Sequence, residues 1–116
     1  MPRLAWCLIA IGLLLQPVSG ALNPVAAQAD RPVVYVVPVT GIIDLGLAPF
    51  LSRTIREAQD AGAAAVVLDI NTFGGRVDAA VAMRDALLGS PVKTIAFVNQ
   101  RAISAGALIT LACEQV

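Results

Sequence analysis

Histidine is absent from this 116-residue chain, and Lys93 is its only lysine. A serine–histidine triad therefore cannot be built from these residues alone. Charged residues make up only 14% of the chain and the formal net charge is zero. With no basic run in the sequence, we expect no nucleic-acid partner. The two cysteines are far apart in sequence, so we predict neither a metal site of the usual zinc kind nor another cofactor.

Apolar residues, in contrast to charged ones, are abundant in this chain. They account for 58% of the chain, which excludes an intrinsically disordered protein. The length suits one small domain.

The N-terminal residues have the composition of a secretory leader. Arg3 precedes an apolar run from Leu4 to Leu15, which is shorter than the roughly 20 residues that span a bilayer. We expect cleavage after Gly20 or after Ala29, with an uncleaved anchor as the alternative. Residues 1–29 are thus predicted to be signal peptide and linker, and residues 30–116 an exported domain. Only Cys113, expected to be a small buried apolar residue, would remain after cleavage.

Strand and helix patterns alternate after this leader. A Val-rich strand, apolar enough to be covered on both faces, is followed by an amphipathic helix. The pattern then repeats twice, which predicts an α/β fold with a parallel sheet and right-handed crossovers. The expected elements are strand 32–39 continuing to 44, helix 47–61, strand 63–70, a glycine turn 71–76, helix 78–88, strand 92–98, and a last helix from Ser104. The apolar side of helix 47–61 is expected to consist of Phe50, Leu51, Ile55 and Ala58. That of helix 78–88 is expected to consist of Val77, Val81, Leu87 and Leu88. No stop signal follows that helix, so we expect the domain to be cut short at Val116.

Two strand-to-helix junctions carry the chemistry. Ser104 opens the last helix with small neighbours, and Gly74 and Gly75 lie in the preceding junction. In a parallel sheet both junctions fall at the same edge, where α/β proteins bind ligands. Ser104 is then the candidate nucleophile, and the N–H groups of Gly74 or Gly75, together with that of Ala105, are candidate oxyanion donors. The alternatives are an ordinary serine N-cap and an ordinary tight turn.

A general base for Ser104 is harder to find. Lys93 begins the strand that Ser104 follows, so it lies roughly 20 Å away at the opposite edge. Asp69 and Asp78 flank the glycine turn, but carboxylates of ordinary pKa are poor bases for a hydroxyl. We expect Asp69 to be a strand-end residue and Asp78 to be a charge at the N-terminus of the following helix.

Three runs of the sequence resemble a known family. They are Leu-Asp-Ile-Asn-Thr-Phe-Gly-Gly-Arg-Val-Asp-Ala-Ala from Leu68, Ala-Met-Arg-Asp-Ala-Leu-Leu-Gly-Ser-Pro-Val from Ala82, and Phe-Val-Asn-Gln-Arg-Ala-Ile-Ser-Ala-Gly-Ala-Leu-Ile from Phe97. From Val33 to Val116 the chain resembles NfeD-type membrane-bound serine proteases of the ClpP class, which share the ClpP/crotonase fold. It departs from their Thr-Pro-Gly-Gly motif at Phe73.

The resemblance implies a serine endopeptidase with a Ser-Lys dyad, in which Ser104 is the serine and the lysine lies beyond Val116. It also implies cleavage of apolar segments of membrane-associated proteins, stomatin-like partners, homo-oligomers, and a full-length protein anchored on the extracytoplasmic side of the membrane. The alternative is a non-catalytic ClpP-like scaffold that binds such partners. Acyl-CoA chemistry on the related crotonase fold is disfavoured by the leader and by Ser104.

Overall fold

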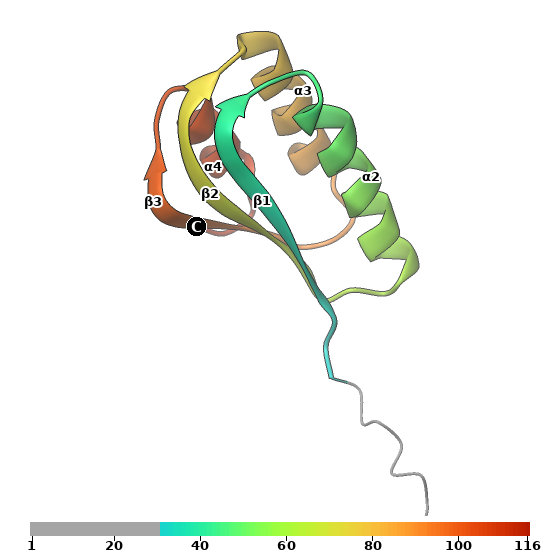
Figure 1. Ribbon diagram of the computed structural model, residues 1–116. Helices are drawn as coiled ribbons and strands as arrows, with labels where there is room; N and C mark the ends of the chain where they lie inside the picture. Colours follow the sequence, from blue (N-terminus) through green and yellow to red (C-terminus); the bar gives the residue numbers. More distant parts are fainter. Residues whose placement is uncertain (1–30) are drawn as a thin grey trace, which may run out of the picture. The chain divides into compact units, whose positions relative to one another are not determined.

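A computed structural model describes residues 31–116 (Figure 1). Strands and helices alternate in it, and the three strands form one parallel sheet in the order β1-β2-β3. The predicted α/β fold is therefore confirmed. The leader, its cleavage positions and Cys7 lie outside the described residues. The elements are β1 Val34–Ile43, α2 Leu47–Asp60, β2 Ala65–Gly75, α3 Val77–Leu88, β3 Thr94–Ala102 and α4 Ala105–Ala112.

The sheet buries one face under the helices, which lie together on one side of it in Figure 1. Alternate strand residues point to this side and are almost completely buried: Val37, Val39, Leu68, Ile70 and Ala96. On the other face Val34, Val36 and Phe97 are 47%, 63% and 56% exposed. The expectation that the Val-rich strand is covered on both faces is thus wrong for residues 31–116. Strands added in chain order with crossovers of one hand leave all the helices on one face.

Not all of the helix residues that were predicted to face the sheet are buried. In α2, Leu51, Ile55 and Ala58 are buried as predicted, whereas Phe50 is 37% exposed. In α3 the buried residues are Ala79, Ala80, Met83 and Leu87. The predicted contribution of Val77 and Leu88 is wrong, because they lie beside this i, i+4 row and are exposed. Within residues 31–116 no helix is long and apolar enough to cross a membrane.

Both strands that lead to the candidate site are longer than predicted. β2 continues through the expected glycine turn to Gly75, because its end pairs with neighbours on both sides. Asn71 and Thr72 are in register with Arg101 and Ala102 of β3. Beyond a shift in register, Gly74 and Gly75 pair with Ile42 and Ile43 of β1. Residues typical of turns are thus held in strand geometry by pairing that a local pattern does not reveal.

The end of α4 also differs from the prediction. The helix stops at Ala112, and Cys113 has extended backbone angles. Gln115 then pairs with β3 in parallel: its N–H donates to the Thr94 carbonyl (3.1 Å), and its carbonyl accepts from the Ala96 N–H (2.8 Å). The Thr94 hydroxyl also accepts a hydrogen bond from the Glu114 N–H. Thr94 thus holds the residues after α4 against β3, a contact that the sequence did not indicate. Cys113 is half-buried, and this burial raises the pKa of its thiol to about 11.

Thr72 joins three parts of the fold at the end of β2. It is 1% exposed, and its hydroxyl donates to the Gly41 carbonyl of β1 and accepts from the Gly74 N–H at 2.9 Å. Its methyl group lies against Gly106, where a side chain on the first turn of α4 would collide with it. Thr72 therefore fixes both the glycine segment and the position of α4 on the sheet.

We predict that Thr72→Val lowers the free energy of unfolding by about 2–3 kcal/mol, because it leaves a partly buried carbonyl and a buried N–H without their shared partner. Thr54→Val is the matched control. The Thr54 hydroxyl donates only to the Phe50 carbonyl within α2, so its loss should cost less than about 1 kcal/mol. Urea unfolding of the three proteins measures the difference. Equal losses for the two variants would contradict the joining role of Thr72.

Candidate active site

Ser104 lies at the junction between β3 and α4, in an unusual backbone conformation. Its φ is 55° and its ψ is −117°, and within residues 31–116 it is the one non-glycine residue with positive φ. Such a conformation costs about 1–3 kcal/mol and persists only where the surroundings impose it. A serine on a strained strand-to-helix turn presents its hydroxyl at the edge of the sheet, as nucleophiles of α/β hydrolases do. The Ser104 side chain is solvent-exposed.

The N-cap alternative for Ser104 is only partly met. Ser104 occupies the N-cap position, and its carbonyl accepts from the Ala107 N–H at 2.9 Å. Its hydroxyl, however, makes no capping hydrogen bond, and a capping serine normally has extended backbone angles. Helix initiation therefore uses the backbone of Ser104 and leaves the hydroxyl for other contacts.

Gly74 brings the two junctions together. It has φ 106°, and a Cβ placed on it would lie 2.9 Å from the Cβ of Ser104, 2.9 Å from the Ile103 carbonyl oxygen and 3.2 Å from the Ala105 nitrogen. Only glycine combines that φ with such close neighbours. The expectation that both junctions share one edge of the sheet is thus confirmed, and Gly74, Ser104 and Ala105 are in direct proximity.

The N–H groups at this edge are not equivalent. That of Gly74 is taken by the Thr72 hydroxyl. The Arg76 N–H donates to Ile43 at 2.9 Å, and since successive N–H groups of an extended strand alternate in direction, the Gly75 N–H points away from β1. β3 ends opposite Thr72 and leaves that side of Gly75 uncovered. The Ala105 N–H, in the first turn of α4, makes no hydrogen bond within residues 31–116.

Gly75 and Gly106 serve close packing. A Cβ on Gly75 would overlap the backbone of Ile43 in β1. Gly75 therefore allows β1 and β2 to approach closely, and Gly106 allows α4 to start against the Thr72 side chain. The sequence assigns no role to Thr72, and it indicates for Gly106 only that a small residue leaves the backbone beside Ser104 open to a peptide. The small residues after Ser104 were a signal for close packing, but nothing in the sequence identified Thr72 as the contact.

The sequence offers Lys93, Asp69 and Asp78 as bases for Ser104 and predicts each of them to be unsuitable. Lys93 is exposed, and its carbonyl accepts from Val66 near the start of β2, at the opposite end of the sheet from Ser104. Asp69 is in the middle of β2, between Pro38 and Phe97, so its assignment to the strand end is wrong. One of its carboxylate oxygens is buried without a partner.

Asp78 acts at the start of α3, as predicted. It accepts two hydrogen bonds from Arg76 (3.0 and 2.7 Å) and one from the Ala79 N–H. The hydrogen bond from Arg76 holds the pKa of Asp78 below its usual value. An acid that is ionised so readily is a weak base, so Asp78 is poorly suited to be the general base for Ser104.

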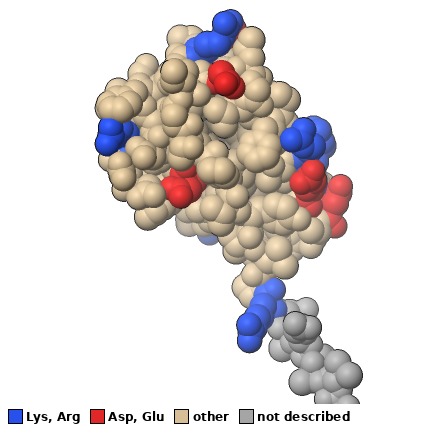
Figure 2. All heavy atoms as spheres, in the orientation of Figure 1, with Lys and Arg blue, Asp and Glu red and all other residues tan. Residues whose placement is uncertain are grey.

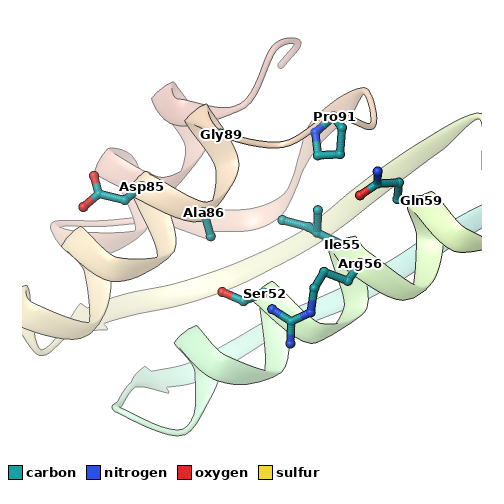
Figure 3. Close-up of a pocket in the computed structure, with 8 residues that line it drawn as sticks. All are labelled: Ser52, Ile55, Arg56, Gln59, Asp85, Ala86, Gly89 and Pro91. Carbon is teal, nitrogen blue, oxygen red and sulfur yellow. The ribbon is translucent and has the colours of Figure 1, made fainter.

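The larger hollows lie away from these residues. A groove of about 470 Å³ runs between α2 and α3, with Arg56 on one wall and Asp85 on the other (Figure 3). Figure 2 shows charged side chains scattered over the visible face without a basic patch. Within residues 31–116 no group of histidine, cysteine or acidic residues could hold a metal ion.

A family model and a sequence relative both relate this chain to NfeD1b proteins. The model of the family "NfeD1b, N-terminal domain" matches residues 33–116. The membrane protein NfeD1b of Bacillus subtilis (strain 168) is 43% identical over 107 residues, which cover 91% of this chain and 24% of that protein. The chain thus spans about a quarter of the length of this relative.

Solved structures show the same fold. The 1510-N membrane protease specific for a stomatin homolog, from Pyrococcus horikoshii, superposes with a TM-score of 0.65 at 29% identity, over 72% of this chain and 43% of that one. ClpP1 from Listeria monocytogenes superposes with a TM-score of 0.64 at 25% identity, over 68% and 46%. The described residues form part of a ClpP-like fold, and the chain belongs to the NfeD1b N-terminal domain family.

Proposed function

We propose that this chain supplies the nucleophile and the oxyanion site of a serine endopeptidase, whose lysine base comes from outside these 116 residues. The single observation that carries the proposal is Ser104 itself. Its backbone is strained, its hydroxyl makes no capping bond, and it lies against Gly74. A fold that needed only an N-cap would have no use for this conformation.

The neighbouring N–H groups support the same reaction. When the Ser104 hydroxyl adds to a peptide carbonyl, the oxygen becomes an anion that needs donors already in place. The N–H groups of Gly75 and Ala105 are suited to this, because the Gly75 N–H points away from β1 and the Ala105 N–H has no hydrogen-bond partner within residues 31–116. The start of α4 adds a partial positive charge. The Gly74 N–H is occupied by Thr72, so we assign to Gly74 the close approach and not the oxyanion.

The substrate is proposed from the surroundings of this edge and from the relatives. β2 extends past the end of β3, so the Gly75 backbone is open to pairing with an extended peptide. Phe73, Val77 and Ile103 beside it are 70%, 73% and 49% exposed, which favours apolar segments. One relative is a membrane protein, and another is a protease for a stomatin homolog. We therefore propose stomatin-like membrane proteins as substrates, cleaved on the extracytoplasmic side.

The first test is Ser104→Ala in the whole protein that carries this chain. We expect cleavage of apolar peptides to fall by several orders of magnitude, because the substitution removes the nucleophile. Ser90→Ala is the control: its hydroxyl bonds to Val92 in the α3–β3 connection, and activity should be unchanged. Undiminished cleavage by the Ser104→Ala protein would remove Ser104 from the site and leave a peptide-binding scaffold as the function.

A second test concerns Gly74. We predict that Gly74→Ala lowers cleavage at least about a hundredfold, because a methyl group there would displace Ser104, and small misplacements of reacting groups are that costly. Gly62→Ala is matched to it, since Gly62 also has positive φ (63°) but faces open space. Both variants should lose some stability, measurable by thermal unfolding, whereas only Gly74→Ala should lose activity. Equal activities would refute the contact's role in positioning Ser104.

The 116-residue chain alone should show no serine-dependent cleavage, because an unactivated hydroxyl is a weak nucleophile at neutral pH. The measurement compares this chain with its Ser104→Ala variant and with the whole protein, on one apolar peptide. Serine-dependent turnover by the short chain would require a base within these residues and contradict the proposed external lysine.

A further inference from the structure

Phe73 and Arg101 form a stacked pair beside the candidate nucleophile. The Arg101 guanidinium carbon lies 4.5 Å from the centre of the Phe73 ring. Phe73 immediately precedes Gly74, which contacts Ser104, and Arg101 lies three residues before Ser104 at the end of β3. Phe73 is nonetheless 70% exposed, so most of the ring is free to meet a ligand. The pair combines an apolar surface with a positive charge.

The Arg101 side chain is held in place by its neighbours, but its positive charge is not paired with a carboxylate within residues 31–116. The ring holds one face of the guanidinium, and one terminal nitrogen donates to the Gln100 side-chain oxygen at 3.3 Å. That oxygen also accepts from Asn71 of β2 at 3.4 Å. The salt bridges within residues 31–116 do not include Arg101, whereas Arg76 at the same end of the sheet is paired with Asp78. A partly buried arginine that is fixed in this way keeps donors for a carboxylate.

The pair lies on the face of β2 opposite to the Gly74–Ser104 contact. Thr72 and Gly74 are buried, and Phe73 between them points to the open side. A peptide that adds as a strand beside Gly75 presents successive side chains to alternate faces of the sheet. Every second residue of such a peptide would therefore meet the side on which Phe73 and Arg101 lie.

We infer that the Phe73–Arg101 pair determines specificity, selecting peptides in which an acidic side chain on that face flanks the apolar residues at the cleavage point. The apolar part of the acidic residue contacts the ring, and its carboxylate accepts hydrogen bonds from Arg101. This inference rests on the proposed function, because it places a substrate peptide at the edge of β2.

The test uses the whole protein in its Ser104→Ala form, so that binding is measured without cleavage. Fluorescein-labelled apolar peptides, acetylated and amidated so that no terminal charge remains, carry one Glu, one Gln or one Lys moved along the sequence. We expect Glu peptides to bind about fivefold more tightly than Gln peptides, the size of an exposed charge pair. Lys peptides should bind more weakly still. The preference should recur at alternate positions.

Arg101→Gln should abolish this preference, and Phe73→Leu should reduce it by releasing the guanidinium. Arg56→Gln is the matched control: it removes the same charge from α2, in the groove of Figure 3, and should leave the preference intact. A preference that is absent, or that survives Arg101→Gln, overturns the inference. So does an equal loss in Arg56→Gln, which would indicate a general effect of net charge.

The wild-type protein separates this inference from the proposed function. Ser104-dependent cleavage of Glu, Gln and Lys peptides at equal rates would sustain the protease and reject the selection. An Arg101-dependent binding preference without any cleavage would sustain recognition of acidic peptides and reject the protease. Neither binding nor cleavage would reject both.

Discussion

The contact between Gly74 and Ser104 is the constraint on which the rest of this edge depends. A hypothetical side chain at Gly74 would meet the Ser104 Cβ and the backbone on both sides of it. The two junctions can therefore approach only because one residue lacks a side chain and adopts positive φ. The approach in turn holds Ser104 in its strained conformation, since a free strand-to-helix turn would relax into a lower-energy one.

Several other features serve this contact. Thr72 ties the Gly74 N–H and the Gly41 carbonyl to one hydroxyl, which fixes the shift in register between β1 and β2. Gly106 lets α4 start directly on Thr72, and Gly75 lets β1 approach from the other side. The three glycines thus let neighbouring segments approach more closely than residues with side chains would allow. Among the N–H groups there, that of Ala105 makes no hydrogen bond within residues 31–116.

The described residues hold some of the groups that the proposed reaction needs and lack others. Within residues 31–116 the hydroxyl and the N–H donors come together, but Lys93 is at the far end of the sheet and Asp78 is paired with Arg76. The chain covers a quarter of its Bacillus relative. Val34, Val36 and Phe97 on the open face of the sheet are apolar side chains that residues 31–116 leave exposed.

The sequence alone determined the order of strands and helices, the parallel sheet and the edge at which Ser104 and the glycines meet. Hydrophobic periodicity and glycine placement are local properties, and they reflect what each segment buries. It also determined the family, through the runs around Gly74 and Ser104.

Only the tertiary structure decided where the elements end and what each glycine does. β2 runs to Gly75 and α4 stops before Gln115 because neighbouring strands satisfy their backbone groups, and such pairing is not written in the local sequence. The same holds for the directions of the two glycine N–H groups. Gly74 and Gly75 are identical in composition, yet one N–H is bound by Thr72 and the other is directed away from β1, because their directions depend on a shift in register between two strands.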